Sequence, residues 1–216
     1  MGLGILVIDD HHAIAQALTV TLAAAGFDWA EALASEELHV AGAVDAARRS
    51  EPDVVLVDLN LGAAGSGLPI VRALCQAGHT VVVFTASNAT SDIANSLRAG
   101  AVGFVNKSEP FDAIVEYAKR AAAHDHVIDE DQRRAILEAA DADDAEAADR
   151  LNRLLSLTDR EREILAQLAE GLTVKQIAQA SSGSVGTVRV HVDRIRKKLD
   201  VDTQFGAVAV FREFNR

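Results

Sequence analysis

Short apolar runs alternate with longer amphipathic segments over the first 123 residues of the chain. The runs are rich in β-branched residues and predict buried strands, whereas the segments between them repeat apolar positions as helices do. The predicted strands are Leu3–Ile8, Trp29–Ala34, Val54–Val57, Val81–Phe84 and Ala101–Val105. The predicted helices cover 13–25, 40–49, 69–76, 92–99 and 110–123. Strands that are apolar on both faces indicate an α/β fold with a five-stranded, doubly wound parallel sheet.

A different pattern begins near Leu157, after which every predicted element is a helix. Two of the helix starts carry capping boxes, formed by Thr158 with Glu161 and by Thr173 with Gln176. Ser184 is expected to cap a third helix over 185–199, and Thr203 is expected to cap a fourth. Two helices that flank a short turn with glycine, the second of them basic, predict a helix-turn-helix in an all-α domain.

The segment between these two patterns, residues 131–150, is rich in alanine and aspartate and poor in large apolar side chains. This composition cannot build a core of its own, although its alanines favour helix. We therefore predict three regions. They are a first domain over 1–123, a partly helical linker over 124–152 and a second domain over 153–216.

The charge of the chain is unevenly distributed. Hydrophobic residues make up 49% of the 216 residues and charged residues 25%, which excludes wholesale disorder and a fibrous repeat. The net charge of −11 by itself disfavours nucleic acid as a partner. Residues 1–130, however, carry 7 basic and 17 acidic side chains, residues 131–150 carry 3 and 7, and residues 151–216 carry 11 and 8. An acidic half joined to a basic tail indicates two modules with different partners.

The environment of the protein is suggested by what the sequence lacks. Its single cysteine, Cys75, cannot form an internal disulfide, so we expect a reducing cytoplasm. No apolar run approaches the roughly 18–20 residues that a membrane span needs. The first residues also lack the basic stretch of a signal peptide. We therefore expect no membrane partner.

Polar side chains follow the predicted strands at the edge of the sheet where ligands of doubly wound folds bind: Asp9, Asp10, Asp58, Thr85 and Lys107. One such residue would more often be only a solvated strand end, but five together indicate a site. Three carboxylates repel one another unless a hard cation such as Mg²⁺ joins them. A lysine and a hydroxyl can stabilise phosphoryl oxygens, and a carboxylate can be a nucleophile that forms an aspartyl phosphate.

Both halves of the chain resemble the two-component response regulators of the NarL/FixJ family, which carry a LuxR-type helix-turn-helix. Residues 1–123 are similar to the flavodoxin-like receiver domain, and residues 153–216 are similar to the DNA-binding domain. The receiver motifs are Asp9-Asp10, Asp58, Phe84-Thr85-Ala86 and the segment from Gly103 to Lys107. The signature segments of the second half are 157–165, 170–172, 177–178, 187–191 and 198–199.

The resemblance implies a role for each receiver motif. A sensor histidine kinase would donate phosphate to Asp58, and Thr85 and Lys107 would bind the phosphoryl group. The implied ligands of Mg²⁺ are Asp9, Asp10, Asp58 and Asn60, the last through its backbone carbonyl. Thr85 and Phe104 would form the switch, although simple core packing explains Phe104 equally well.

The resemblance also implies that the second domain binds double-stranded DNA and that phosphorylation favours a homodimer. The expected DNA-facing residues are Lys175, Thr187, Arg189, Val190, Asp193, Arg194, Lys197 and Lys198. The turn 181–183 lacks the apolar residues of the family, Gly186 weakens the start of the recognition helix, and Asp193 stands where relatives often have a basic residue. We therefore expect an unusual site preference or a low affinity.

Two other functions are compatible with the residues. A degenerate helix-turn-helix could serve only assembly, so that the protein acts through protein contacts. The acidic cluster could instead belong to a metal-dependent phosphatase, although nothing in the sequence supplies a substrate pocket, and we expect no chemistry beyond transfer to Asp58 and its slow hydrolysis. The histidines at 11, 12, 124 and 126 are interpreted as solvated side chains and not as metal ligands.

Overall fold

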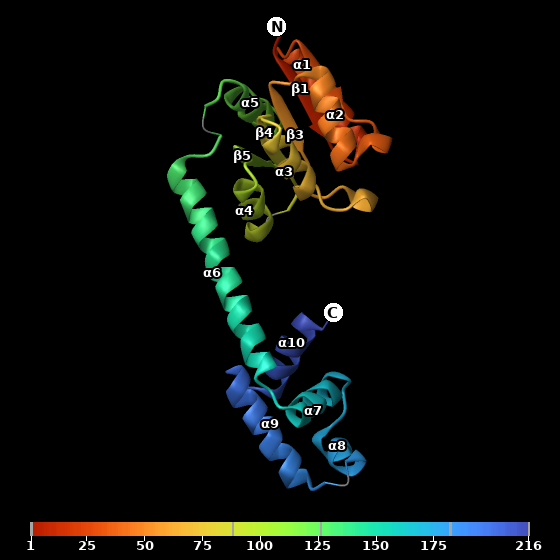
Figure 1. Cartoon of the computed structure of the whole chain (residues 1–216), viewed down its shortest axis with the longest axis vertical. Coiled ribbons are helices and arrows are strands. Elements are labelled where there is room, and N and C mark those ends of the chain that lie inside the picture. Colours follow the sequence, from red (N-terminus) through yellow and green to blue (C-terminus); the bar gives the residue numbers. More distant parts are fainter. Residues whose placement is uncertain (1, 88, 126, 182, 216) are drawn as a thin grey trace. The chain divides into compact units, whose positions relative to one another are not determined.

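The computed structural model describes residues 2–87, 89–125, 127–181 and 183–215. The chain divides into two compact units, Met1–Ala140 and Asp141–Arg216, and each is described by itself (Figure 1). No helix of the described residues is long and apolar enough to cross a membrane.

The first unit is built on a five-stranded parallel sheet with the strand order β2-β1-β3-β4-β5. The strands are β1 (Gly4–Ile8), β2 (Trp29–Ala32), β3 (Val54–Val57), β4 (Val81–Thr85) and β5 (Gly103–Asn106). All five match the predicted runs, with β5 beginning two residues later than expected. The doubly wound parallel sheet predicted from the sequence is therefore confirmed.

Helices cover both faces of this sheet. They are α1 (His12–Ala24), α2 (Val40–Ser50), α3 (Leu68–Gln76), α4 (Thr90–Arg98) and α5 (Phe111–Ala122), with short 3-10 turns η1 (Ser35–Glu37) and η2 (Gly62–Ala64). Alternate residues of each strand enter different cores, because successive side chains of a strand point to opposite faces. In β1, Ile5 and Val7 pack with α1 and α5, whereas Leu6 and Ile8 pack with α2 and α3.

The strand order fixes where a ligand can bind. β1 is hydrogen-bonded to β2 on one side and to β3 on the other, so the winding of the chain reverses between β1 and β3. The crevice beyond the carboxyl ends of these two strands is the usual binding place of such sheets. The lone cysteine, Cys75 on α3, lies elsewhere. Burial raises its pKa to about 11, which keeps the group a thiol at neutral pH.

Helix α6 (Glu130–Leu155) runs without interruption through the segment for which a partly helical linker was expected. The boundary between the two units falls inside it, between Ala140 and Asp141.

All the secondary-structure elements among the described residues of the second unit are helices. It contains the end of α6 and the helices α7 (Asp159–Ala169), α8 (Val174–Ala180), α9 (Val185–Leu199) and α10 (Gln204–Phe214). The two predicted capping boxes are both formed, and Ser184 and Thr203 each accept a backbone N–H as helix caps, as expected. The apolar stripe of α9 is buried against the other helices: Val188, Val192, Ile195 and Leu199. Ser182, in the predicted turn 181–183, lies outside the described residues.

Candidate functional site

Two buried carboxylates lie side by side at the crevice between β1 and β3. The strands are in register with Ile8 opposite Val57, so the next residues, Asp9 and Asp58, become neighbours. The backbone N–H of Asp58 donates to the carbonyl of Ile8 at 2.8 Å, which extends this register by one residue. Both carboxylates are almost fully enclosed, and such burial of charge requires a compensating cation.

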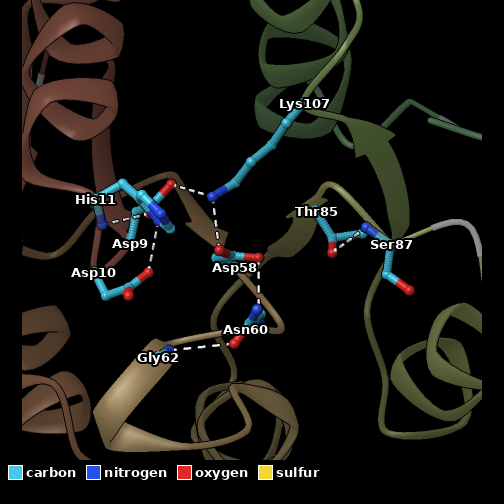
Figure 2. Close-up of polar contacts among 9 residues, drawn as sticks. All are labelled: Asp9, Asp10, His11, Asp58, Asn60, Gly62, Thr85, Ser87 and Lys107. Atoms are coloured by element: carbon cyan, nitrogen blue, oxygen red, sulfur yellow. Dashed lines mark hydrogen bonds and ion pairs between the residues drawn. The ribbon is translucent and has the colours of Figure 1, made fainter.

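Lys107 supplies the cation. It directly follows β5, an edge strand of the sheet. Its Nζ lies 2.6 Å from Asp9 Oδ2 and 2.6 Å from Asp58 Oδ2, and it is 5.2 Å from the centre of the Phe84 ring (Figure 2). Only 11% of the Lys107 side chain is exposed. One ammonium group therefore joins two carboxylates in a region that water screens weakly, where charge-assisted hydrogen bonds are strong.

Asp10 lies at the outer side of the same pocket, next to His11. The Nδ1 atom of His11 is 2.9 Å from Asp10 Oδ1 and 3.3 Å from Asp9 Oδ1, and its backbone N–H donates to Asp9 Oδ1 at 2.8 Å. The contact between His11 Nδ1 and Asp10 Oδ1 is close enough for an ion pair but is not aligned as a hydrogen bond. Asp10 Oδ1 is therefore buried with no hydrogen bond. Sequence reasoning treated His11 only as a solvated side chain. The signal that could have identified it is its position directly after the acidic pair.

The loop after β3 folds back over Asp58. The backbone N–H of Asn60 donates to Asp58 Oδ1 at 3.1 Å, and the side chain of Asn60 accepts from the N–H of Gly62 at 3.2 Å. A side chain at Gly67 would collide with the carbonyl oxygen of Asp58, so glycine is needed where the chain returns to the site. The loop thus holds one oxygen of Asp58 while Lys107 holds the other.

Thr85 lies at the end of β4, on the other side of Asp58 from the acidic pair (Figure 2). Its hydroxyl accepts the backbone N–H of Ser87 at 3.1 Å, and Ser87 in turn donates to Asp92 at 2.9 Å. The hydroxyl proton of Thr85 thus remains available to a ligand. A hollow of about 410 Å³ adjoins it, lined in part by Asn60 and Thr85. The hollow therefore lies between the Thr85 side chain and the loop that follows Asp58.

The pocket has the donors that a hard divalent cation requires. Asp9, Asp10, His11 and Asp58 each offer a ligand atom, and these atoms all lie within 4.8 Å of one another. Three of them are carboxylate oxygens, the ligand type that Mg²⁺ prefers, and Asp10 Oδ1, which is buried with no hydrogen bond, is suited to coordinate the ion. The carboxylates expected to hold Mg²⁺ therefore fit the ion. Asn60 lies next to these carboxylates, because it follows Asp58 by two residues and its N–H donates to Asp58 Oδ1.

Gly62 offers a test of the role of Asp10. It has a φ of 53°, and a Cβ there would collide with Asp10 Oδ2. Gly62→Ala is therefore expected to displace the carboxylate and to lower Mg²⁺ affinity about tenfold or more, measured by calorimetric titration. Gly65→Ala is the matched control, because Gly65 also has positive φ, 88°, but nothing lies within 4 Å of its Cβ position. Equal affinities of the two variants would contradict coordination by Asp10.

A basic surface of the second unit is formed by α9 and the start of α8. Seven of the eight residues predicted to face DNA are exposed there: Lys175, Thr187, Arg189, Val190, Asp193, Arg194 and Lys197. Thr187 is partly engaged in capping α9, since its hydroxyl lies 2.9 Å from that of Ser184. Asp193 is 3.4 Å from Arg196 on the same helix, which offsets its repulsion of phosphate.

Lys198, the eighth residue, instead points into its own domain. Its Nζ donates to Glu161 Oε2 at 2.7 Å and to the carbonyl of Ser156 at 3.1 Å. Burial alone would raise the pKa of Glu161. Hydrogen bonds from Lys198 and Thr158, together with the charge of Lys198, hold this pKa below its usual value. Lys198 therefore helps to hold α9 against α7. The amphipathic pattern of α9 could not reveal this contact, because its partner Glu161 lies on another helix.

Comparison with known proteins gives a family for each unit. Residues 5–119 match the response regulator receiver domain, and residues 155–211 match the bacterial regulatory proteins of the luxR family. The chain is 31% identical to the nitrate/nitrite response regulator protein NarP of Escherichia coli, over 96% of this chain and 93% of that protein. It is 29% identical to the DNA-binding transcriptional activator DevR/DosR of Mycobacterium tuberculosis, over 98% and 95%.

Solved structures agree with the fold. The RcsB response regulator of Salmonella typhimurium matches with a TM-score of 0.50 and 18% identity over 98% of both chains. A LuxR-family response regulator of Aurantimonas matches with a TM-score of 0.53 and 22% identity, over 66% of this chain and 99% of that one. The chain therefore belongs to the two-component response regulators that join a receiver domain to a LuxR-type DNA-binding domain and regulate transcription.

Proposed function

We propose that the receiver is phosphorylated on Asp58 by the phosphohistidine of a partner sensor kinase. The observation that carries this proposal is the position of Asp58, buried beside Asp9 and bonded through separate oxygens to Lys107 and to the N–H of Asn60. A carboxylate held in one orientation, at the edge of the sheet where ligands of such folds bind, is suited to attack an incoming phosphoryl group.

In the proposed transfer, an oxygen of Asp58 attacks phosphorus while the bond from phosphorus to the kinase imidazole breaks. The imidazole nitrogen leaves with the electron pair and later takes a proton from solvent. Bound Mg²⁺, held by Asp9, Asp10, Asp58 and the Asn60 carbonyl, would neutralise charge on the phosphoryl oxygens. Lys107 exchanges its contact with Asp58 for a phosphoryl oxygen, and the Thr85 hydroxyl donates to another. Slow hydrolysis of the aspartyl phosphate returns the resting state, and we propose no other reaction.

The phosphoryl group adds about −1.5 to −2 charges next to Thr85. The movement of Thr85 toward it vacates space on the side of Phe104, which lies on the neighbouring strand β5. Phe104 is half-buried and packs against the core beneath α3. Thr85 and Phe104 are therefore the proposed switch between the resting and the activated receiver.

The second unit is proposed to read DNA through α9, with Arg189, Val190 and Arg194 at the major groove and Lys197 near phosphates. One such helix binds weakly, so two copies of the chain are expected on paired half-sites after phosphorylation. The regulator then acts where the bacterial chromosome is, in the cytoplasm. Lys198 is reassigned to packing, because its charge is paired with Glu161.

DNA binding is tested with fragments selected from the source genome, with and without an acyl phosphate donor. Arg189→Ala is expected to weaken binding about tenfold to hundredfold, the usual cost of losing a base contact. The matched control is Arg160→Ala, which removes the same charge from α7, where Arg160 pairs with Glu163. Affinity should also fall steeply with added salt. A loss that is equal in the two variants, or binding that ignores salt, would contradict reading by α9 and favour assembly.

A further inference from the structure

The exposed face of α9 carries a single carboxylate, that of Asp193, which is the only acidic residue of this helix. Asp193 follows the exposed Val190 by three residues and precedes the exposed Lys197 by four. These spacings place the three side chains on one face of a helix, and this face lies opposite the apolar stripe that α9 buries. Asp193 is therefore in the middle of the surface that α9 presents to a ligand.

The charge of Asp193 is out of place on a surface that approaches DNA. Arg189, Arg194 and Lys197 give this side of α9 the positive charge that suits phosphate. The Asp193 side chain is 65% exposed and repels phosphate oxygens. Its pairing with Arg196 offsets only part of this cost, because exposed ion pairs are worth little. The carboxylate is fully compensated in a complex only where DNA supplies a hydrogen-bond donor to it.

Arg196 leaves the carboxylate able to accept such a donor. Its Nη1 lies 3.4 Å from Asp193 Oδ1, from a position three residues further along the same helix. A carboxylate accepts hydrogen bonds through both of its oxygens, so one contact does not exhaust it. Arg196 thus restricts the orientation of Asp193 without using all of its capacity as an acceptor.

The major groove offers donors from only two of the four bases. These donors are the amino groups at N6 of adenine and at N4 of cytosine, whereas guanine and thymine present acceptors. In adenine the acceptor N7 lies beside the amino group and would repel the second oxygen of a carboxylate. Cytosine presents its amino group without such a neighbouring acceptor. The carboxylate of Asp193 therefore fits cytosine best.

The position of the cytosine follows from the geometry of the two helices. Three residues of an α-helix advance about 4.5 Å along its axis, which separates Asp193 from Val190. Successive bases of one DNA strand are about 3.4 Å apart. When α9 places Val190 against a base edge, Asp193 thus lies about one or two base pairs away.

We propose that Asp193 determines specificity by accepting a hydrogen bond from the N4 amino group of a cytosine in the major groove. The inference rests on the proposed function, since it takes α9 as the helix that enters the groove. It goes beyond that function by assigning one base of the site to one side chain. The same carboxylate lowers the affinity for DNA that lacks this cytosine, because its charge then stays unpaired beside phosphate.

The assignment is tested on the full chain, with an acyl phosphate donor and Mg²⁺, by selecting bound duplexes from a randomised library. Affinities are then measured for the four duplexes that differ at the position which Asp193→Ala alters. The wild type is expected to prefer cytosine there about tenfold, and Asp193→Ala should lose the preference at this position alone. Asp193→Asn should move the preference to adenine, because an amide pairs with both N6 and N7.

Glu163→Ala is the matched control. Glu163 is also an exposed carboxylate that pairs with an arginine three residues away, but it lies on α7. This variant should select the same sequences as the wild type.

Two results overturn the role of Asp193. One is an Asp193→Ala chain that binds all duplexes more tightly with unchanged preferences, since the carboxylate then only repels phosphate. The other is a wild-type preference for a base other than cytosine at the altered position. Either result leaves the reading of DNA by α9 intact, because the comparison of Arg189→Ala with Arg160→Ala decides it. A wild type that selects no sequence overturns both proposals.

Discussion

Asp58→Asn is expected to abolish uptake of a phosphoryl group by the regulator. The amide has nearly the shape of the carboxylate, but its oxygen is a poor nucleophile, and Asp58 is the carboxylate that lies between the acidic pair and Thr85 (Figure 2). Asp9 is turned to Lys107 and His11, and Asp10 lies at the outer side. Uptake is measured with labelled acyl phosphate or phosphorylated kinase in the presence of Mg²⁺.

The matched control for this variant is Asp45→Asn. Asp45 is 62% exposed on α2 and lies 3.9 Å from Arg48, so it shares the chemical change but not the pocket. It should take up phosphate at the wild-type level. Fluorescence of Trp29, the only tryptophan of the chain, would show that the receiver of each variant is folded. Labelled phosphate on Asp58→Asn would contradict the proposed site.

Glu161→Ala is expected to loosen the DNA-binding unit by about 2 kcal/mol, since it removes two hydrogen bonds to a buried carboxylate, one of which belongs to the capping box of α7. Glu161 Oε2 accepts the N–H of Thr158 at 2.9 Å and the ammonium of Lys198 at 2.7 Å, and so joins the start of α7 to α9. Its side chain is 4% exposed, and that of Lys198 is 35% exposed, which limits the loss from the unpaired lysine.

The two units can be followed separately during denaturation. The only tryptophan and the only tyrosine, Trp29 and Tyr117, both lie in the first unit, whereas circular dichroism reports helices of both units. In urea, Glu161→Ala should shift the dichroism transition but not the fluorescence transition. Glu163→Ala, which removes an exposed carboxylate from the same helix, should shift neither. A fluorescence shift, or equal behaviour of the two variants, would contradict the role of Glu161.

The same contact predicts a dependence on pH. The pKa of Glu161 in the folded chain lies below its usual value of 4.5, so the folded state favours the ionised carboxylate. The resulting stabilisation is complete above the pKa of the unfolded chain and is lost as the pH falls through the lower, folded pKa. The wild-type dichroism midpoint should therefore decrease on acidification in this range more than that of Glu161→Gln.

The sheet and the acidic pocket could be predicted from the sequence because local signals and topology agree. β-branched runs such as Val54–Val57 read as buried strands, and a parallel sheet brings their carboxyl ends together. Lys107 therefore contacts Asp9 and Asp58 as expected, although it lies far from both of them in the sequence. The helix caps at Thr158 and Thr173 were equally predictable, since each depends on residues three positions apart.

The sequence was less informative where a side chain chooses between neighbours. Lys198 lies in a basic segment typical of phosphate contact, yet its partner Glu161 is 37 residues away and only folding reveals the pair. Residues 131–150 contain few of the large apolar side chains that mark a packed helix, so the continuity of α6 was not anticipated. Its contact with α4 depends on few side chains, above all Arg133, a residue that composition alone places in solvent.

Lys107 has a consequence for the synthesis of the protein. Its contacts with Asp9 and Asp58 span 98 and 49 positions of the chain, so both acidic residues leave the ribosome long before their counter-ion does. Until β5 has joined the sheet, two adjacent carboxylates remain without the lysine that balances them, and closing such long loops is slow. On the proposed function, a kinase that requires the complete pocket would thus act only on receivers whose chain has been made and folded beyond Lys107.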